Sequence, residues 1–211
     1  MNWPVAADRE GLAHAANLLR AGGVVAFPTE TYYGLAVDPF NCRALDRLFA
    51  IKRRPRHHPI LVLVAGCDQL PLLTGEIPAV YHRLIERFWP GPLTLVCPAL
   101  PSLPPQLTGN TRTVGVRRSP NETAAALIAA FGGPVTATSA NITGFPAAVS
   151  AREVSRIFEN EIDLIVDGGV APGGAGSTLV GLDRGELLCI REGRIAFAAV
   201  RASVADFSQN Q

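Results

Sequence analysis

Residues Ile51 to Ile60 read I-K-R-R-P-R-H-H-P-I, which places six cationic or potentially cationic side chains within seven residues. The preceding residues 44–49 follow an amphipathic helical pattern, and residues 60–64 form an apolar run typical of a buried strand. A helix, a cationic bend and a strand in this order predict positive groups at the edge of an α/β core. Such a bend suits an anionic ligand such as phosphate. A solvated basic turn is the alternative, because charge runs often lie at the surface.

The composition of the 211 residues, 48% hydrophobic and 18% charged with a formal net charge of +1, is that of a globular protein. We expect a single domain over residues 1–211 with a core from about residue 8 to residue 200, which is long enough to bury a substantial interior. The balance of charge argues against broad binding of nucleic acid as a polyelectrolyte, although a local basic groove remains possible.

The apolar runs, the first residues and the cysteines of the sequence bear on the cellular location of the protein. Its apolar runs are all too short to span a bilayer, and its first residues do not show the basic-then-apolar order of a signal peptide. The four cysteines are far apart and form no C-x-x-C pair, so we expect reduced thiols in place of disulfides or a zinc site. These features predict a cytoplasmic protein without a dedicated metal cage.

Expected strands and helices alternate along the chain. Helices are predicted to begin at the caps Asp8, Asn41, Ser119 and Ser150, with further helices over residues 68–73 and 78–88. The expected strands are residues 24–27, 35–37, 60–64, 93–97, 113–117, 135–138, 163–166, 177–182 and 186–190. The last two resemble an antiparallel pair, and residues 98–110 are expected to form a loop. The fold class is therefore α/β, with a twisted, mixed parallel and antiparallel sheet flanked by helices.

Polar side chains gather where four of the expected strands and helices end, at residues 29–31, 52–58, 117–118 and 139–141. Residues just after strand ends converge at one edge of such a sheet and can line one cleft. Each segment alone has a plainer interpretation: loop hydroxyls, a solvated His57–His58 pair, or an Asx-type turn at residues 139–141. Together they predict an anion-binding cleft, but they do not define a reaction.

Several segments taken together resemble the YrdC-like family. They are residues 28–35 (PTETYYGL), 52–55 with 59–60, 89–94 (WPGPLT), 114–117, 138–144 (TSANITG), and 176–179 with 190–193. The similarity covers most of the chain in order, and it includes a K-x-R signature at Lys52 and Arg54 and an S-x-N signature at Ser139 and Asn141. It implies a YrdC-like single domain of the short bacterial type.

The resemblance also implies an activity. Members of the family make threonylcarbamoyl-adenylate, so this chain is expected to be a nucleotidyltransferase that condenses L-threonine, bicarbonate and ATP to threonylcarbamoyl-AMP and pyrophosphate for tRNA modification. Mg²⁺ is expected to arrive with ATP, held by phosphate oxygens and water, with no tightly bound cofactor. Separate proteins would transfer the group to tRNA. The alternative is an RNA-binding module without synthase activity that contacts tRNA or double-stranded RNA through residues 52–58.

The resemblance assigns roles to individual residues. The expected catalytic residues are Lys52, Arg54, Ser139 and Asn141. The expected threonine-binding residues are Thr31, Arg117, Ser139 and Ser177, with Arg117 pairing the amino acid's carboxylate. The expected ATP-binding residues are Lys52, Arg54, His58, Thr113, Asn141 and Arg191. Residues 168–176, which are rich in glycine, are expected to act as a lid or a linker, since they lack the phosphate-binding pattern G-x-x-x-x-G-K-[ST].

Overall fold

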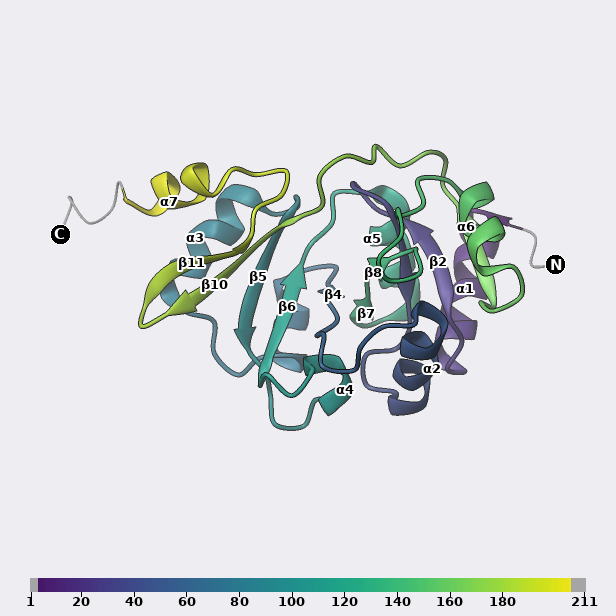
Figure 1. Ribbon diagram of the computed structural model, residues 1–211, viewed down its shortest axis with the longest axis horizontal. Coiled ribbons are helices and arrows are strands. Elements are labelled where there is room, and N and C mark those ends of the chain that lie inside the picture. Colours follow the sequence, from purple (N-terminus) through teal and green to yellow (C-terminus); the bar gives the residue numbers. More distant parts are fainter. Residues whose placement is uncertain (1–3, 206–211) are drawn as a thin grey trace.

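The computed structural model describes residues 4–205, which form two sheets with helices packed against them (Figure 1). The strands are β1 (Val5–Ala6), β2 (Val25–Pro28), β3 (Tyr33–Ala36), β4 (Val62–Leu63), β5 (Leu93–Pro98), β6 (Thr113–Arg117), β7 (Val135–Thr136), β8 (Thr138–Ser139), β9 (Leu164–Asp167), β10 (Thr178–Asp183) and β11 (Glu186–Arg191). The helices are α1 (Arg9–Arg20), α2 (Cys42–Lys52), the 3₁₀ helix η1 (Cys67–Leu72), α3 (Ala79–Phe88), α4 (Pro105–Thr108), α5 (Glu122–Phe131), α6 (Ala151–Phe158) and α7 (Phe197–Ala205).

Both sheets mix parallel and antiparallel pairs, which confirms the predicted α/β class. The first sheet has the order β1-β9-β2-β3-β8, and the second has the order β11-β10-β5-β6-β4-β7. In the first, β2 pairs parallel with β9 and antiparallel with β3. In the second, β5 pairs parallel with β10 and antiparallel with β6. The expected β10–β11 antiparallel pair is also present.

The strands form two sheets where one was expected, and the reason lies at residues 135–138. We expected a single strand there, but the chain passes from one sheet to the other. Thr136 pairs with Val62 of β4 in the second sheet, whereas Thr138 pairs with Leu35 of β3 in the first. Between them, the amide of Ala137 donates to the carbonyl of Leu61 at 2.8 Å. The two sheets therefore meet at this point.

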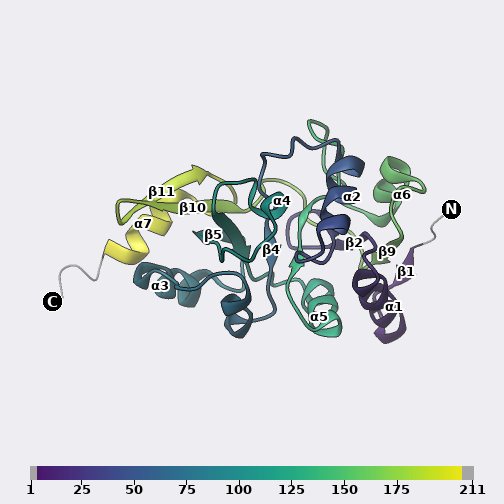
Figure 2. The ribbon, with the colours of Figure 1, turned by 90° about the horizontal axis from the view of Figure 1, so that it is seen from below.

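Strand β2 is buried on both faces because helices cover both sides of the first sheet. Figure 2 shows α1 and α5 on one side and α2 and α6 on the other. Val25 and Phe27 join a hydrophobic cluster with residues of α1 and α5, while Val24 and Ala26 join the larger cluster that contains residues of α2 and α6. In the second sheet, α3 and α7 contribute Tyr81 and Val200 to this larger cluster. The continuous apolar sequence of residues 24–27 reflects this two-sided burial.

Three of the four predicted helix caps are confirmed. Asp8 accepts from the amide of Gly11 at 2.9 Å, Asn41 from Ala44 at 3.1 Å, and Ser150 from Glu153 at 3.3 Å. The fourth prediction is wrong.

Helix α5 is capped by Asn121, whose side chain accepts from the amide of Ala124 at 3.0 Å. Ser119 lies outside the helix. Its hydroxyl donates to Glu30 Oε2 at 2.5 Å and accepts from the amide of Asn121 at 3.2 Å.

Other boundaries differ from the predictions in short segments. The expected loop at residues 98–110 contains α4, and neither β1 nor α7 was predicted. The helix expected over residues 68–73 is the 3₁₀ helix η1, with Pro71 inside it. None of the helices described within residues 4–205 is long and apolar enough to cross a membrane.

Candidate active site

A cavity of about 750 Å³ lies between the two sheets. One wall is the β2–β3 hairpin with β8, the other is formed by β5, β6, β10 and β11, and the loop between α2 and β4 adds a third side. Its size is within the range of small-molecule and cofactor sites. The predicted site residues that line it are Thr31, Arg54, His58, Thr113, Arg117, Ser139, Ser177 and Arg191. The predicted convergence of distant segments on one cleft is therefore confirmed, while the individual roles of these residues stay predictions.

Lys52 and Asn141 are the predicted site residues that do not belong to the described cavity lining. Lys52 is 1% exposed. Its ammonium donates to the carbonyl of Ser139, to the carbonyl of Asn141 at 2.8 Å and to Asn141 Oδ1 at 3.2 Å. Asn141 Oδ1 also accepts from the Ser139 hydroxyl at 2.6 Å. Lys52 thus holds the backbone of the 139–141 loop, and Ser139 is the member of this group that lines the cavity.

The K-x-R spacing sends the two cationic side chains to different places, because Arg53 between them reverses the direction of the chain. Lys52 is the last residue of α2, and Arg53 follows as its C-cap in the left-handed conformation at φ 49°. The turn leaves Lys52 pointing into the 139–141 loop and brings Arg54 to the cavity. There, Arg54 Nη2 donates to the carbonyl of Pro59 at 2.8 Å and its Nε to that of His58 at 3.3 Å.

Burial lowers the pKa of Lys52 to about 7, and the positive charge of Arg54 acts in the same direction. The three oxygen acceptors around the ammonium favour its charged form. Burial and these hydrogen bonds thus act on the pKa of Lys52 in opposite directions, and burial has the larger effect.

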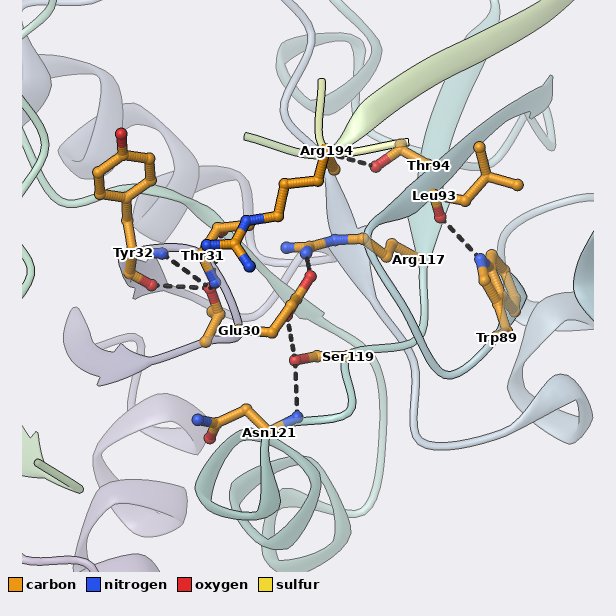
Figure 3. A network of polar contacts seen from close by, with 12 residues as sticks. Glu30, Thr31, Tyr32, Trp89, Leu93, Thr94, Arg117, Ser119, Asn121 and Arg194 are labelled. Carbon is orange, nitrogen blue, oxygen red and sulfur yellow. Dashed lines mark hydrogen bonds and ion pairs between the residues drawn. The ribbon is translucent and has the colours of Figure 1, made fainter. Parts of the chain in front are cut away.

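Arg117 is paired within the protein, which the sequence analysis did not anticipate. Figure 3 shows its guanidinium against the carboxylate of Glu30, which also contacts Ser119. The side chains of Arg117 and Glu30 are only 5% and 10% exposed. Burial lowers the pKa of Arg117 to about 9, with the charge of Arg191 acting in the same direction, so the guanidinium stays charged at pH 7. The Glu30 contact involves Nη1, and Nε is buried without a hydrogen-bond partner within residues 4–205.

His58 lines the cavity beside a second imidazole. The rings of His57 and His58 meet edge to face with their centroids 4.5 Å apart. Partial desolvation lowers the pKa of His58, and the charges of His57 and Arg54 add to the effect. His58 is therefore mainly neutral at pH 7, which limits the positive charge that it brings to the site.

The cavity also contains polar groups that sequence reasoning missed. Thr94 donates its hydroxyl to Ser177 Oγ at 2.9 Å, and Arg191 Nη2 donates to the carbonyl of Ser177 at 2.9 Å. Tyr32 lines the first wall beside Thr29, which belongs to the predicted polar segment 29–31. Thr94 lies in the WPGPLT segment and Tyr32 in PTETYYGL, so the motifs indicated the right segments without showing which side chains face inward.

The cavity carries more positive than negative charge. Three arginines line it, Arg54, Arg117 and Arg191, and Glu192 is the acidic residue of its described lining. Residues 4–205 hold no group of three or more His, Cys, Asp or Glu side chains that could bind a metal ion. Such a surface suits a ligand with several anionic oxygens.

The fold and this cavity define an α/β protein with a nucleotide-sized, arginine-lined cavity between two sheets. The family model Sua5_yciO_yrdC, described as "Telomere recombination", matches residues 17–193. The chain belongs to this family, and the resemblance to YrdC-like proteins is confirmed.

Individual relatives share much of the chain. A threonylcarbamoyl-AMP synthase of Halorhodospira halophila is 43% identical over 155 residues, covering 74% of this chain and 81% of the relative. One of Pyrococcus abyssi is 38% identical over 192 residues, covering 91% of this chain and 56% of the relative. The crystal structure of P. abyssi Sua5 complexed with L-threonine is similar with a TM-score of 0.90 at 37% identity, covering 94% of this chain and 58% of that one. The chain thus spans little more than half the length of the P. abyssi protein.

Proposed function

We propose that this protein is an L-threonylcarbamoyladenylate synthase, a nucleotidyltransferase that acts on L-threonine, bicarbonate and ATP. The observation that carries the proposal is the cavity between the sheets, where Arg54, Arg117 and Ser139 meet from three separate segments. Relatives named threonylcarbamoyl-AMP synthase, and a similar structure complexed with L-threonine, support the same activity.

The reaction asks for positioning and charge neutralisation more than for a protein nucleophile. The amine of threonine combines with carbon dioxide from bicarbonate to give a carbamate and releases a proton. A carbamate oxygen then attacks the α-phosphorus of ATP, the new P–O bond forms, and pyrophosphate leaves with the electrons of the broken bond. A cavity lined by arginines offsets the charge on the phosphates and the amino acid and holds the reactants together.

The side chains have different proposed roles according to where they lie. Arg54 and Arg191 face the cavity as partners for phosphate oxygens, with His58 and Thr113 beside them. Arg117 pairs with the threonine carboxylate, while Thr31, Ser139 and Ser177 orient the substrate by hydrogen bonds. Lys52 and Asn141 act by holding the 139–141 loop.

Mg²⁺ would enter with ATP. Carboxylates are scarce in the described lining, so its ligands would be phosphate oxygens and water. The product would pass to separate proteins that modify tRNA, and a cytoplasmic location stays a prediction.

The direct test is pyrophosphate release by the purified protein with ATP, magnesium, bicarbonate and threonine. We expect release that depends on threonine, and none when threonine is omitted. Arg54→Ala should lower kcat/KM by about 100-fold, the effect of losing one preorganised donor. Arg56→Ala is the matched control, because Arg56 pairs with Asp46 on the surface at 2.7 Å and lies outside the described cavity lining. A folded protein that releases no threonine-dependent pyrophosphate would contradict the proposal.

RNA binding through residues 52–58 remains the alternative. The structure reduces the charge free for this role, because Lys52 is buried, Arg56 is paired with Asp46 and Arg54 contacts two carbonyls. Binding of tRNA that weakens steeply with salt would support it, since that slope reports the phosphates neutralised. Affinity that does not change with salt would exclude it.

A further inference from the structure

Residues 168–176, here called the strap, carry the chain from β9 in the first sheet to β10 in the second (Figure 1). Ala175 and Gly176 at its end line the cavity. The strap is therefore the connection between the two walls and also part of the site. The sequence predicted a lid or a linker for this segment, and its hydrogen bonds show how it is held.

The first wall holds the strap along its length. The Tyr33 hydroxyl donates to the carbonyl of Gly169 at 2.7 Å, and the amide of Ala171 donates to Val149 at 2.8 Å. Further along, the amide of Gly173 donates to the carbonyl of Thr31 at 2.7 Å, and the Tyr32 hydroxyl donates to the carbonyl of Gly174.

The second wall holds the end of the strap through one arginine. Arg194 follows β11, and its Nη2 donates to the carbonyl of Gly173 at 2.6 Å while its Nε donates to that of Ala175 at 3.2 Å. Its backbone amide donates to the carbonyl of Gly176 at 2.9 Å. Figure 3 shows the Arg194 side chain extending towards Thr31 and Tyr32 of the opposite wall. Residues 173–175 are thus held from both sides of the cavity.

The chemistry of this contact is specific to arginine and to the strap's backbone. Gly173 and Gly174 have φ of 67° and 83°, a conformation that glycine adopts readily, and neither has a side chain to anchor the segment. The guanidinium can donate to two carbonyls at once in a fixed planar geometry, which a lysine ammonium does not reproduce. Arg194 is itself exposed and lies outside the described lining of the cavity, so it acts on the site only through the strap.

We propose that Arg194 is a positioning residue that holds the strap closed over the cavity, and that this closure retains the carbamate formed from threonine and carbon dioxide. The proposal rests on the proposed synthase function. Carbamate formation is reversible, because the N–C bond breaks on protonation of nitrogen and returns carbon dioxide and the amine. A strap that opens often lets water and carbon dioxide exchange before the oxygen reaches phosphorus. Loss of the Arg194 contacts should therefore be seen first in the dependence on bicarbonate.

Hydrogen exchange tests the contact itself, whatever the activity of the protein. In Arg194→Gln, peptides that contain the Gly173 amide should exchange faster than in the wild type, because the strap opens locally more often. Tyr32→Phe, which removes the donor on the opposite wall, should act in the same direction. Arg201→Gln removes a charge from the exposed face of α7 and should leave exchange of the strap unchanged. Strap exchange in Arg194→Gln equal to that in the wild type would overturn the proposal.

Kinetics test the consequence for the reaction. Arg194→Gln should raise the KM for bicarbonate by about fivefold or more, with the KM for ATP changed less than about twofold. Arg194→Lys should behave like Arg194→Gln, because a lysine side chain lacks the separate Nε and Nη2 donors that reach the carbonyls of Ala175 and Gly173. Equal changes in the KM for all three substrates, or full activity in Arg194→Lys, would overturn the proposal. If the wild type shows no threonine-dependent pyrophosphate release, the synthase function fails, and the exchange result alone decides whether Arg194 holds the strap.

Discussion

Glu30 is the residue whose role changes most once its surroundings are known. It sits between the Arg117 guanidinium and the Ser119 hydroxyl, with both members of the ion pair nearly fully buried. Glu30→Ala would leave a buried charge without its partner, so we expect the free energy of unfolding to fall by about 3 to 5 kcal/mol. Denaturant unfolding of the purified variant measures this directly.

The surface pair of Arg56 and Asp46 provides the matched comparison. Its side chains are 68% and 41% exposed. Asp46→Ala should therefore lower the free energy of unfolding by less than about 1 kcal/mol. If Glu30→Ala costs no more than Asp46→Ala, Arg117 is not held by a buried pair.

The lowered pKa of Lys52 predicts that the stability of the protein depends on pH. Its folded pKa of about 7 lies below the ordinary value of 10.5, so the unfolded state binds more protons between these two pH values. The contribution of Lys52 to the free energy of unfolding must then rise with pH across this window. Compared with Lys52→Met, the wild type should gain stability between about pH 7 and about pH 9.5 in urea unfolding. A constant difference between the two proteins would mean that Lys52 stays protonated, held by its three acceptors.

Most of the site residues predicted from the sequence line the cavity, but the sequence did not show the pairing that fixes Arg117. Arg54 and Ser139 were predictable because each belongs to a motif that follows a helix or strand. The partner of Arg117 was not, because Glu30 is 87 positions away and reads locally as one more polar loop residue. Lys52 was expected to face a ligand, but its side chain points into the protein. The left-handed turn at Arg53 that follows it could not be recognised from the local sequence.

At the scale of single elements, the start of α5 offers two candidate caps within residues 119–122, Ser119 and Asn121. Asn121 caps the helix, so Asn121→Ala should lower the free energy of unfolding by about 1 kcal/mol. Asn121→Asp should be close to neutral, because aspartate also accepts from the helix amides. Chemical denaturation of both variants measures the difference. Equal losses in the two would show that the Asn121 cap is not what stabilises this end.

The elements themselves were largely predictable from local pattern. Caps at Asp8, Asn41 and Ser150 were placed correctly because each side chain accepts from an amide in the first turn of its own helix. Ser119 fits the same capping pattern, but its hydroxyl is used by Glu30 across the fold. Residues 135–138 resemble one strand because three of the four are β-branched, and only their partners in space divide them into β7 and β8.

For the molecule as a whole, the α/β class followed from the alternation of helices and strands, while the division into two sheets did not. That division matters for function, because the cavity lies between the sheets and the strap joins them. Local sequence contains no record of the separation between two walls. The separation depends on contacts between the strap and each wall. Tyr32 of the first wall contacts Gly174, 142 positions away, and Arg194 of the second wall contacts Gly173.

The most direct measurement is a crystal structure of the protein with ATP and L-threonine. We expect both ligands in the cavity between the sheets, with phosphate oxygens beside Arg54 and the threonine carboxylate beside Arg117 and Ser139. Ligands bound elsewhere on the surface, or a cavity that stays free of both at saturating concentrations, would contradict it.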